Sequence, residues 1–330
     1  MRRPLSLRTL VPVVALAAAA LAVPATASQA APSAGVGAAV PVASGVRAPA
    51  PVVPLTVGDA PAVPTSVAEP AAKAVTARFV VTYHGFSAPA RAAFQRAVDY
   101  WSTQVTSSVP ITVDATYTAL GPGILGSAGP SSVWRDFAGA PKAGTWYVDA
   151  VANRRHGSQL DPSPDVVARF SSSFGNWSFG TGSAPAGTYD FQSVVTHELG
   201  HGLGFLGAGI VSSGQSSVRL LGFPIAYDLA TRKGTTKLLS LPDGSATLAS
   251  ALTSNAVTFD TTKVRGVNGG KPASLYAPST WQQGSSYSHL DEATYRAGDR
   301  DSLMTPKLGS GETIRSAGPI TKAVLKAVGW

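Results

Sequence analysis

The string His197-Glu198-Leu199-Gly200-His201 combines two metal ligands and a general base within five residues. If this segment is helical, His197 and His201 lie one turn apart on the same face, as two ligands of one zinc ion must. Glu198 then lies beside the metal, where its carboxylate can take a proton from a zinc-activated water. The motif therefore predicts a catalytic zinc site. The alternative is a surface helix that carries these residues by coincidence.

A catalytic zinc ion normally takes three protein ligands, so a third ligand must lie elsewhere in the chain. The compact spacing HExxHxxGxxH would place it at position 207, which is glycine. Of the remaining histidines, His84 ends a predicted strand, and two neighbouring arginines beside His156 would oppose binding of a cation. His289 is the preferred third ligand, because it lies in a polar segment that is followed by a Leu-Met-x-Pro sequence.

Other polar residues near His289 leave alternatives open. Glu292 is the rival third ligand, as in thermolysin-like enzymes, although its segment is short and broken by glycine for such a helix. Asp291 and Glu292 could instead orient His289 through its second ring nitrogen. Tyr287 and Tyr295 are both near enough in sequence to assist an oxyanion, and the sequence does not choose between them.

Three motifs in this order are similar to those of a known family. They are His-Glu-x-x-His-x-x-Gly-Phe at 197–205, Ser-x-Ser-His at 286–289 and Leu-Met-x-Pro at 303–306. The combination resembles the leishmanolysin branch of the metzincins, in which an inserted segment displaces the third histidine and a methionine turn lies beneath the zinc. The resemblance covers roughly 190–330. Leishmanolysins are rich in cysteine and this chain has none, so it resembles a disulfide-free bacterial-type relative.

The resemblance carries expectations for individual residues. It implies that one zinc ion is bound by His197, His201 and His289. It also implies that Glu198 is the general base of peptide-bond hydrolysis and that Met304 forms the methionine turn. For Met304 the expected role is packing, which suits a soft and flexible side chain.

The elements that must position these residues alternate between strand and helix periodicity. Strands are predicted at 77–83, 111–117, 145–151 and 166–170, and helices at 89–105 with Ser87 as N-cap, 196–205, 246–254 and 320–328. Dense glycines after His201 indicate a close backbone approach or a sharp turn at Gly204. The pattern predicts an α+β, metzincin-like zinc protease domain. We expect a twisted mixed sheet over an active-site helix, a long insertion before His289 and a C-terminal helix.

The N-terminal region divides into two predicted segments before the catalytic domain at 76–330. Residues 1–30 combine a basic start, an apolar run at 10–23 and small residues at a cleavage site, which indicates a secretory signal peptide. Residues 31–75 consist mainly of Ala, Pro, Val, Gly and Ser without any aromatic residue. This composition predicts a disordered linker or a propeptide.

Composition excludes several classes of protein. Without cysteine, the chain has neither disulfides nor a thiolate that could block the metal. The formal net charge is +8, but the cationic residues are scattered, which argues against nucleic-acid binding and allows only weak attraction to an anionic cell envelope. The sequence has no second apolar run that is long enough to favour stable membrane insertion. No oxygen-rich loop with suitable spacing supports a structural calcium ion, which stays an open alternative.

These observations together predict a secreted, monomeric zinc-dependent endopeptidase that hydrolyses protein or peptide substrates. The alternatives are a zinc amidase that acts on cell-wall peptides and an inactive, zinc-stabilised binding or adhesion module. The intact Glu198 argues against the module, because a binding protein has no need of a general base at that position.

Overall fold

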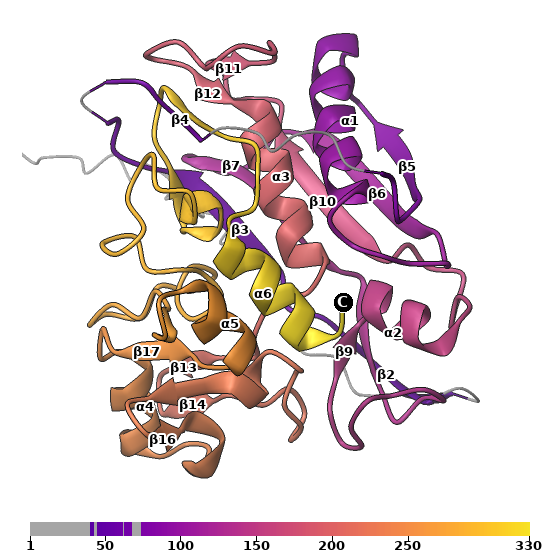
Figure 1. The fold of residues 1–330 in the computed structure, drawn as a ribbon, viewed down its shortest axis with the longest axis vertical. Helices are drawn as coiled ribbons and strands as arrows, with labels where there is room; N and C mark the ends of the chain where they lie inside the picture. The colour runs from indigo at the N-terminus through magenta and orange to yellow at the C-terminus, as the bar shows by residue number, and fades with distance from the viewer. Residues whose placement is uncertain (1–39, 43–44, 62, 68–73) are drawn as a thin grey trace, which may run out of the picture. The chain divides into compact units, whose positions relative to one another are not determined.

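The computed structural model describes residues 40–42, 45–61, 63–67 and 74–330, and it shows a mixed α+β fold with several sheets (Figure 1). The signal peptide expected at 1–30 lies outside the described residues. The α+β class is therefore confirmed.

A six-stranded mixed sheet forms the centre of the fold, in the order β19-β3-β7-β10-β6-β5. Its strands are β3 (Val53–Val57), β5 (Phe79–His84), β6 (Ile111–Thr118), β7 (Ile124–Pro130), β10 (Val166–Ser171) and β19 (Lys307–Leu308). Strands β5, β6 and β10 run parallel to one another, β7 is antiparallel to β10 and β3, and β19 is parallel to β3. The predicted strands at 77–83, 111–117 and 166–170 correspond to β5, β6 and β10.

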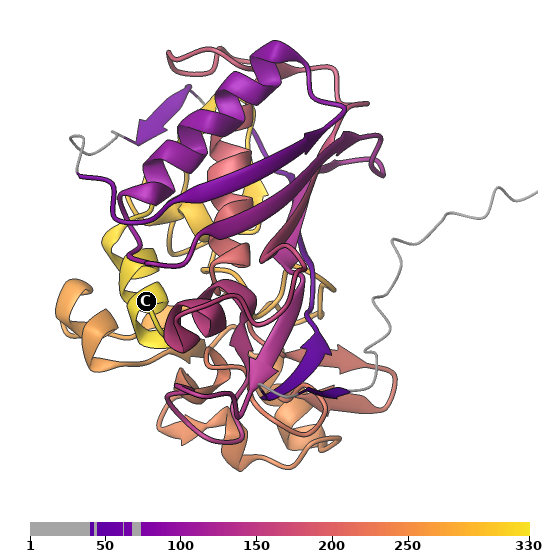
Figure 2. The ribbon, with the colours of Figure 1, turned by 90° about the vertical axis from the view of Figure 1, so that its right-hand side faces the viewer.

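Helices α1 (Ala88–Ser102) and α3 (Phe191–Gly202) pack beside each other on one face of this sheet (Figures 1 and 2). The ring of Phe170 on β10 lies 5.6 Å from that of Phe94 on α1 and 5.4 Å from that of Phe191 on α3. The buried indole of Trp101 on α1 donates to the carbonyl of Thr196 on α3 over 2.9 Å. Side-chain capping by Ser87, which accepts from the amide of Ala90, confirms the predicted start of α1.

The strand predicted at 145–151 is largely wrong. Only β9 (Tyr147–Val148) is extended there, and the chain then forms α2 (Asp149–His156). The carboxylate of Asp149 accepts from the backbone amide of Ser132 and from the indole of Trp134. Both partners belong to β8 (Ser132–Arg135), so this long-range contact fixes the first turn of α2 where local apolar periodicity favours a strand.

Residues 31–75, predicted to be a disordered linker or a propeptide, form strands over much of the part that the structure describes, so the predicted disorder is wrong there. Strands β1 (Val40–Val42), β2 (Gly45–Pro49), β3 and β4 (Thr65–Val67) all fall within it. Strand β2 pairs with β8, β3 pairs with β7, and β4 pairs with β20 (Glu312–Ile314). The segment has no core of its own, but backbone pairing joins it to the sheets of the domain predicted to begin at 76.

The remaining elements lie mostly in the insertion before His289, which forms the orange lower part of Figure 1. They are β13 (Ile210–Ser212), β14 (Gln215–Ser217), β15 (Thr231–Lys233), β16 (Thr236–Lys237), β17 (Val257–Phe259), β18 (Ala273–Ser274), α4 (Ala246–Leu252), α5 (Thr262–Val267) and two 3₁₀ turns at Asp228–Ala230 and Leu238–Ser240. Outside the insertion lie β11 (Trp177–Ser178), β12 (Tyr189–Asp190), a 3₁₀ turn at Ser302–Met304 and α6 (Pro319–Val328). The predicted helices at 246–254 and 320–328 correspond to α4 and α6.

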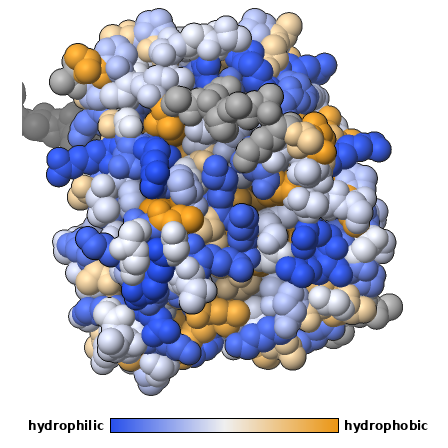
Figure 3. All heavy atoms as spheres, viewed as in Figure 1, coloured by the Kyte–Doolittle hydropathy of each residue, from blue (hydrophilic) through white to orange (hydrophobic). Residues whose placement is uncertain are grey.

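The visible surface mixes hydrophilic residues with small, separate hydrophobic patches (Figure 3). The large apolar side chains that are exposed are scattered along the chain: Val52, Val63, Val75, Val80, Leu221 and Val267. Within the described ranges, we find no helix that combines the length and apolar character of a membrane span.

Candidate metal centre

Helix α3 carries the whole His-Glu-x-x-His motif and is buried along its length. The apolar side chains of Val194, Val195, Leu199 and Leu203 are fully buried. The motif side chains are buried as well, since His197 is 1% exposed and His201 and Glu198 are 0% exposed. The helix ends at Gly202, and Gly204 has a φ of +110°, a region that favours glycine. The sharp turn predicted at Gly204 is therefore present.

Three histidines converge at one point. The Nε2 atoms of His197 and His201 lie 2.9 Å apart, and that of His289 lies 3.2 Å from His201 and 3.3 Å from His197. All three side chains are buried. The structure thus brings together the two motif histidines and the preferred third ligand, which is 88 residues from His201 in the sequence.

The other ring nitrogen of each histidine is held by a backbone carbonyl. His197 Nδ1 lies 2.6 Å from the oxygen of Leu303, His201 Nδ1 lies 2.7 Å from that of Phe205, and His289 Nδ1 lies 2.7 Å from that of Ser285. A carbonyl can only accept, so in each neutral ring the proton is on Nδ1 and Nε2 presents a lone pair. The close Nε2 contacts therefore cannot be hydrogen bonds among neutral rings.

A bound cation would satisfy the three lone pairs. Burial lowers the pKa of His197 to about 4 and, with mutual repulsion among the three rings, holds the pKa values of His201 and His289 well below their usual range. The rings are consequently neutral near pH 7, with three lone pairs facing one another. Nitrogen ligands about 2.0–2.1 Å from a tetrahedral zinc ion lie about 3.3 Å apart, close to the separations observed. The donor set therefore fits a metal of this type.

Backbone pairing positions His289 opposite α3. The amide of Tyr276 donates to the carbonyl of His289 over 2.9 Å, and the amide of Leu290 donates to that of Met304 over 2.7 Å. These bonds attach the His289 segment to the end of the insertion on one side and to the Ser302–Met304 turn on the other. The long insertion thus returns the chain to the metal centre through ordered backbone contacts.

Met304 lies against the glycine in the middle of the motif. Its side chain is 0% exposed, and a Cβ added to Gly200 would lie 2.8 Å from the Met304 sulfur. Glycine at position 200 therefore allows the turn to approach α3, and the neighbouring Leu303 carbonyl receives the His197 ring. The packing role expected for Met304 is confirmed, although the structure alone does not identify a family.

Glu198 is buried on the same helix as His197 and His201. Its Oε1 accepts from the backbone amide of Leu55 over 3.1 Å. Its Oε2 is buried and has no hydrogen-bond partner among the described residues. Burial raises the pKa of Glu198 well above its usual range, and the nearby backbone amides of Leu55 and Ala128 offset part of that rise. One carboxylate oxygen is thus held by the chain, and the other has no hydrogen-bond partner.

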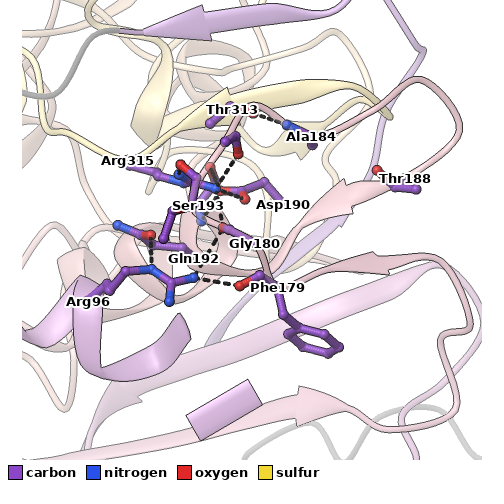
Figure 4. A network of polar contacts seen from close by, with 12 residues as sticks. Arg96, Phe179, Gly180, Ala184, Thr188, Asp190, Gln192, Ser193, Thr313 and Arg315 are labelled. Atoms are coloured by element: carbon purple, nitrogen blue, oxygen red, sulfur yellow. Dashed lines mark hydrogen bonds and ion pairs between the residues drawn. The ribbon is translucent and has the colours of Figure 1, made fainter. Parts of the chain in front are cut away.

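A buried ion pair anchors the start of α3 (Figure 4). Asp190 is the N-cap, accepting from the amide and hydroxyl of Ser193 at 2.9 and 2.6 Å. The guanidinium of Arg315 binds both oxygens of Asp190, at 2.6 and 3.0 Å. Next to this pair, Arg96 of α1 donates to the side chain of Gln192 on α3 over 2.8 Å. These contacts fix the helix end opposite Gly204, and with it the direction of the motif side chains.

The alternative ligands lie elsewhere. His84 is exposed and pairs with Asp114 at 3.3 Å, and the half-buried His156 lies 3.1 Å from the carbonyl of Ala138. Among the described residues, the cluster of side chains that could bind one metal ion consists of the three convergent histidines. Glu292 is not part of it.

Two expectations for supporting residues are corrected by their contacts. The backbone carbonyl of Ser285 accepts the hydrogen bond from Nδ1 of His289, a role expected for Asp291 or Glu292. The hydroxyl of Tyr287 is bonded to Asp228 at 2.8 Å, and that of Tyr295 accepts from the amide of Ser274 at 3.2 Å. Both tyrosine hydroxyls are thus engaged in structural bonds, and neither is identified as an oxyanion donor.

The sequence reasoning missed the backbone partners of the site. The carbonyls of Phe205 and Ser285 lie four residues from the histidines that they hold, a spacing that a local turn can provide. The carbonyl of Leu303 adjoins Met304, so the Leu-Met-x-Pro motif offered a signal. Nothing in the sequence indicated that Leu55 would contact Glu198.

Comparisons with known proteins do not assign this site to a family. No family model, curated protein or solved structure matches the chain. The chemical interpretation of the centre therefore depends on its own residues and their arrangement.

Proposed function

We propose that the protein is a secreted zinc metalloendopeptidase with a metzincin-like catalytic domain. The observation that carries the proposal is the buried triangle of Nε2 atoms from His197, His201 and His289, with Glu198 on the same helix. Each Nδ1 is held by a carbonyl, so the three lone pairs are oriented before any metal binds. Such preorganisation favours a tightly bound ion.

A zinc ion held by three imidazoles supplies a Lewis acid for a peptide carbonyl and a water that is deprotonated near neutral pH. In the proposed reaction, Glu198 accepts the proton of the attacking water and returns it to the leaving amine nitrogen. Oε2 is suited to this task because it is the oxygen without a hydrogen-bond partner. The carbonyl of Leu303 keeps His197 in the tautomer that binds the metal.

The metzincin-like assignment is supported by Met304 and by the course of the chain. Met304 packs against Gly200 within the motif, next to the carbonyl that orients His197. His289 arrives from a separate segment after the long insertion. These features correspond to the displaced histidine and methionine turn of the sequence resemblance.

Export, a protein or peptide substrate and a monomeric state are further parts of the proposal. Export is supported by the signal-like sequence at 1–30. An enzyme is favoured over a zinc-stabilised binding module, because burial of the Glu198 carboxyl group lowers stability and a binding module would have no use for that group. Hydrolysis of cell-wall peptides instead of proteins is an outcome that substrate tests would reveal.

Zinc content and casein hydrolysis test the proposal together. We expect Glu198→Gln to keep one zinc ion per chain and lose activity, and His289→Ala to lose both. His84→Ala is the matched control, because this histidine is exposed and distant from the motif, and it should keep both. A wild-type protein that binds zinc but hydrolyses no peptide, whether intact or cut N-terminally, would contradict the proposal.

A further inference from the structure

Strand β3 lies against the carboxylate that we propose as the general base. The amide of Leu55 donates to Glu198 Oε1 over 3.1 Å, and the two residues are 2% and 0% exposed. The register between β3 and β7 shifts between Leu55 and Thr56, so the irregularity falls at the residue whose amide binds Glu198. A segment of the chain itself thus occupies the space next to the proposed catalytic group.

Strand β3 has a hydrogen-bonded neighbour on each side. On one side, the amide of Val57 donates to the carbonyl of Gly123, just before β7, over 2.9 Å. On the other side, the amide of Gly58 donates to the carbonyl of Leu308 on β19 over 2.8 Å. Neighbouring strands lie about 4.8 Å apart, so removing β3 would leave a slot about 10 Å wide between β7 and β19. Two free strand edges facing such a slot suit one extended peptide.

Leu55 lines a small pocket beside the proposed metal centre. The other lining residues are Ser193, His197, Leu303, Lys307, Leu308 and Ile314. One of them is a proposed zinc ligand, and another supplies the carbonyl that orients it. A side chain at the position of Leu55 therefore lies next to the proposed zinc site. Leu303, Leu308 and Ile314 give this position an aliphatic lining, which favours an aliphatic side chain.

Several features of β3 distinguish it from a permanent central strand. Pro54 has no amide to donate to the ladder, and proline is normally confined to edge strands. Val52, just before the strand, is 50% exposed. The loop after the strand exposes Asp59 and Ala60, so the chain is accessible there. The segment is therefore held between β19 and β7, with exposed residues just before and just after it.

We propose that residues 53–57 occupy the substrate cleft and hold the peptidase latent until the segment is displaced. The substrate would then be an extended peptide that takes the place of β3, with an aliphatic residue in the pocket of Leu55. The inference rests on the proposed peptidase function. Latency here needs no cysteine, because a backbone amide on Glu198 and a leucine in the pocket block the site.

A cleavage test on the full, zinc-loaded chain examines this directly. A recognition sequence for a site-specific protease replaces residues 59–61 in one protein and is inserted between Gly234 and Thr235 in the control. Both sites are exposed, but the second lies in the β15–β16 hairpin. Cutting after β3 should raise hydrolysis of a quenched fluorescent peptide at least tenfold once the fragment is removed. Cutting the hairpin should leave the rate unchanged.

A pair of point variants tests the same idea without cutting. Leu55→Asp places a charge in the apolar pocket and should release β3, raising the rate of the intact chain at least several-fold. Val52→Asp is the matched control, because it adds the same charge to an exposed position next to the strand. It should leave the rate unchanged.

Peptide binding separates failure of this inference from failure of the proposed function. A labelled peptide of residues 50–58 should bind the cut protein in fluorescence anisotropy, and its Leu55→Asp form should not. Binding without hydrolysis would overturn the peptidase, and latency with it, but would keep the strand slot. An intact chain that is already fully active, or a cut active enzyme that ignores the peptide, would overturn the inference and leave the peptidase standing.

Discussion

His197 Nδ1 donates to the carbonyl of Leu303 over 2.6 Å, and this bond joins the motif helix to the turn that contains Met304. The two residues are 106 positions apart, and both are buried. The contact fixes the tautomer of one proposed ligand and places Met304 under Gly200 in the same step. Metal binding and packing of the C-terminal region are therefore coupled.

Removal of the metal should lower stability measurably. A ligand that binds only the folded state stabilises it, and the gain is about 4 kcal/mol when its concentration is 1,000 times Kd. We expect chelator-treated protein to have a lower Tm than the zinc-loaded form, because three lone pairs then face one another without a cation. His289→Ala should show almost no difference between the two conditions in differential scanning calorimetry. An equal zinc-dependent gain in that variant would argue against His289 as a ligand.

The ion pair at the start of α3 should contribute strongly to stability. Arg315→Leu leaves Asp190 buried without its cationic partner and removes a donor from the carbonyls of 180–182. Breaking a buried pair in this way costs about 3–5 kcal/mol. Arg300→Leu is the control, because Arg300 is 68% exposed in its pair with Asp301 and such pairs contribute about 1 kcal/mol or less. Urea unfolding measures both, and similar losses would contradict the account.

Gly202 should be intolerant of a larger side chain. A Cβ at this position would lie 2.5 Å from one methyl carbon of Val166 and 2.7 Å from the other. Val166 is fully buried on β10 and cannot move aside, so Gly202→Ala should cost about 1–3 kcal/mol of unfolding free energy. The double variant with Val166→Ala should lose less than the sum of the single changes. Strict additivity in chemical unfolding would contradict a direct clash.

Glu292 should make stability depend on pH. Burial, with repulsion from Glu312, raises the pKa of its carboxyl to about 7. The folded pKa lies above the unfolded one, so ionisation opposes folding, and stability is lost as the pH rises from about 4.5 through 7. Glu292→Gln should therefore gain more unfolding free energy relative to wild type at pH 8 than at pH 5. A gain that is the same at both pH values would show that the carboxyl titrates normally.

Local patterns predicted the elements that carry their own signal. Helix α1 has a capping serine and apolar residues at helical spacing, and β6 alternates as expected. The motif predicted a helix, and its glycines indicated the turn at Gly204. These features depend on neighbours in the sequence or on a motif with a fixed geometry.

Features that depend on distant partners were not predictable from local patterns. Strand β3 contains Pro54, begins two residues after Pro51 and has no aromatic residue. Its composition therefore resembles that of a linker. Its order comes from β7 and β19, which lie far away in the sequence. Residues 149–156 form a helix because Asp149 contacts β8. A prediction from a short stretch of sequence cannot include this contact. The contact between the Leu55 amide and Glu198 could not be predicted for the same reason.

The central claim is a catalytic zinc ion bound by His197, His201 and His289, with Glu198 as base. The most direct measurement combines zinc K-edge absorption spectroscopy with peptide hydrolysis on the same cut, zinc-loaded protein. We expect three imidazole nitrogens at about 2.0–2.1 Å from zinc in the wild type, no stoichiometric zinc signal in His289→Ala, and an unchanged spectrum with no hydrolysis in Glu198→Gln. A wild-type spectrum that His289→Ala does not alter, or hydrolysis that survives in Glu198→Gln, would contradict the account.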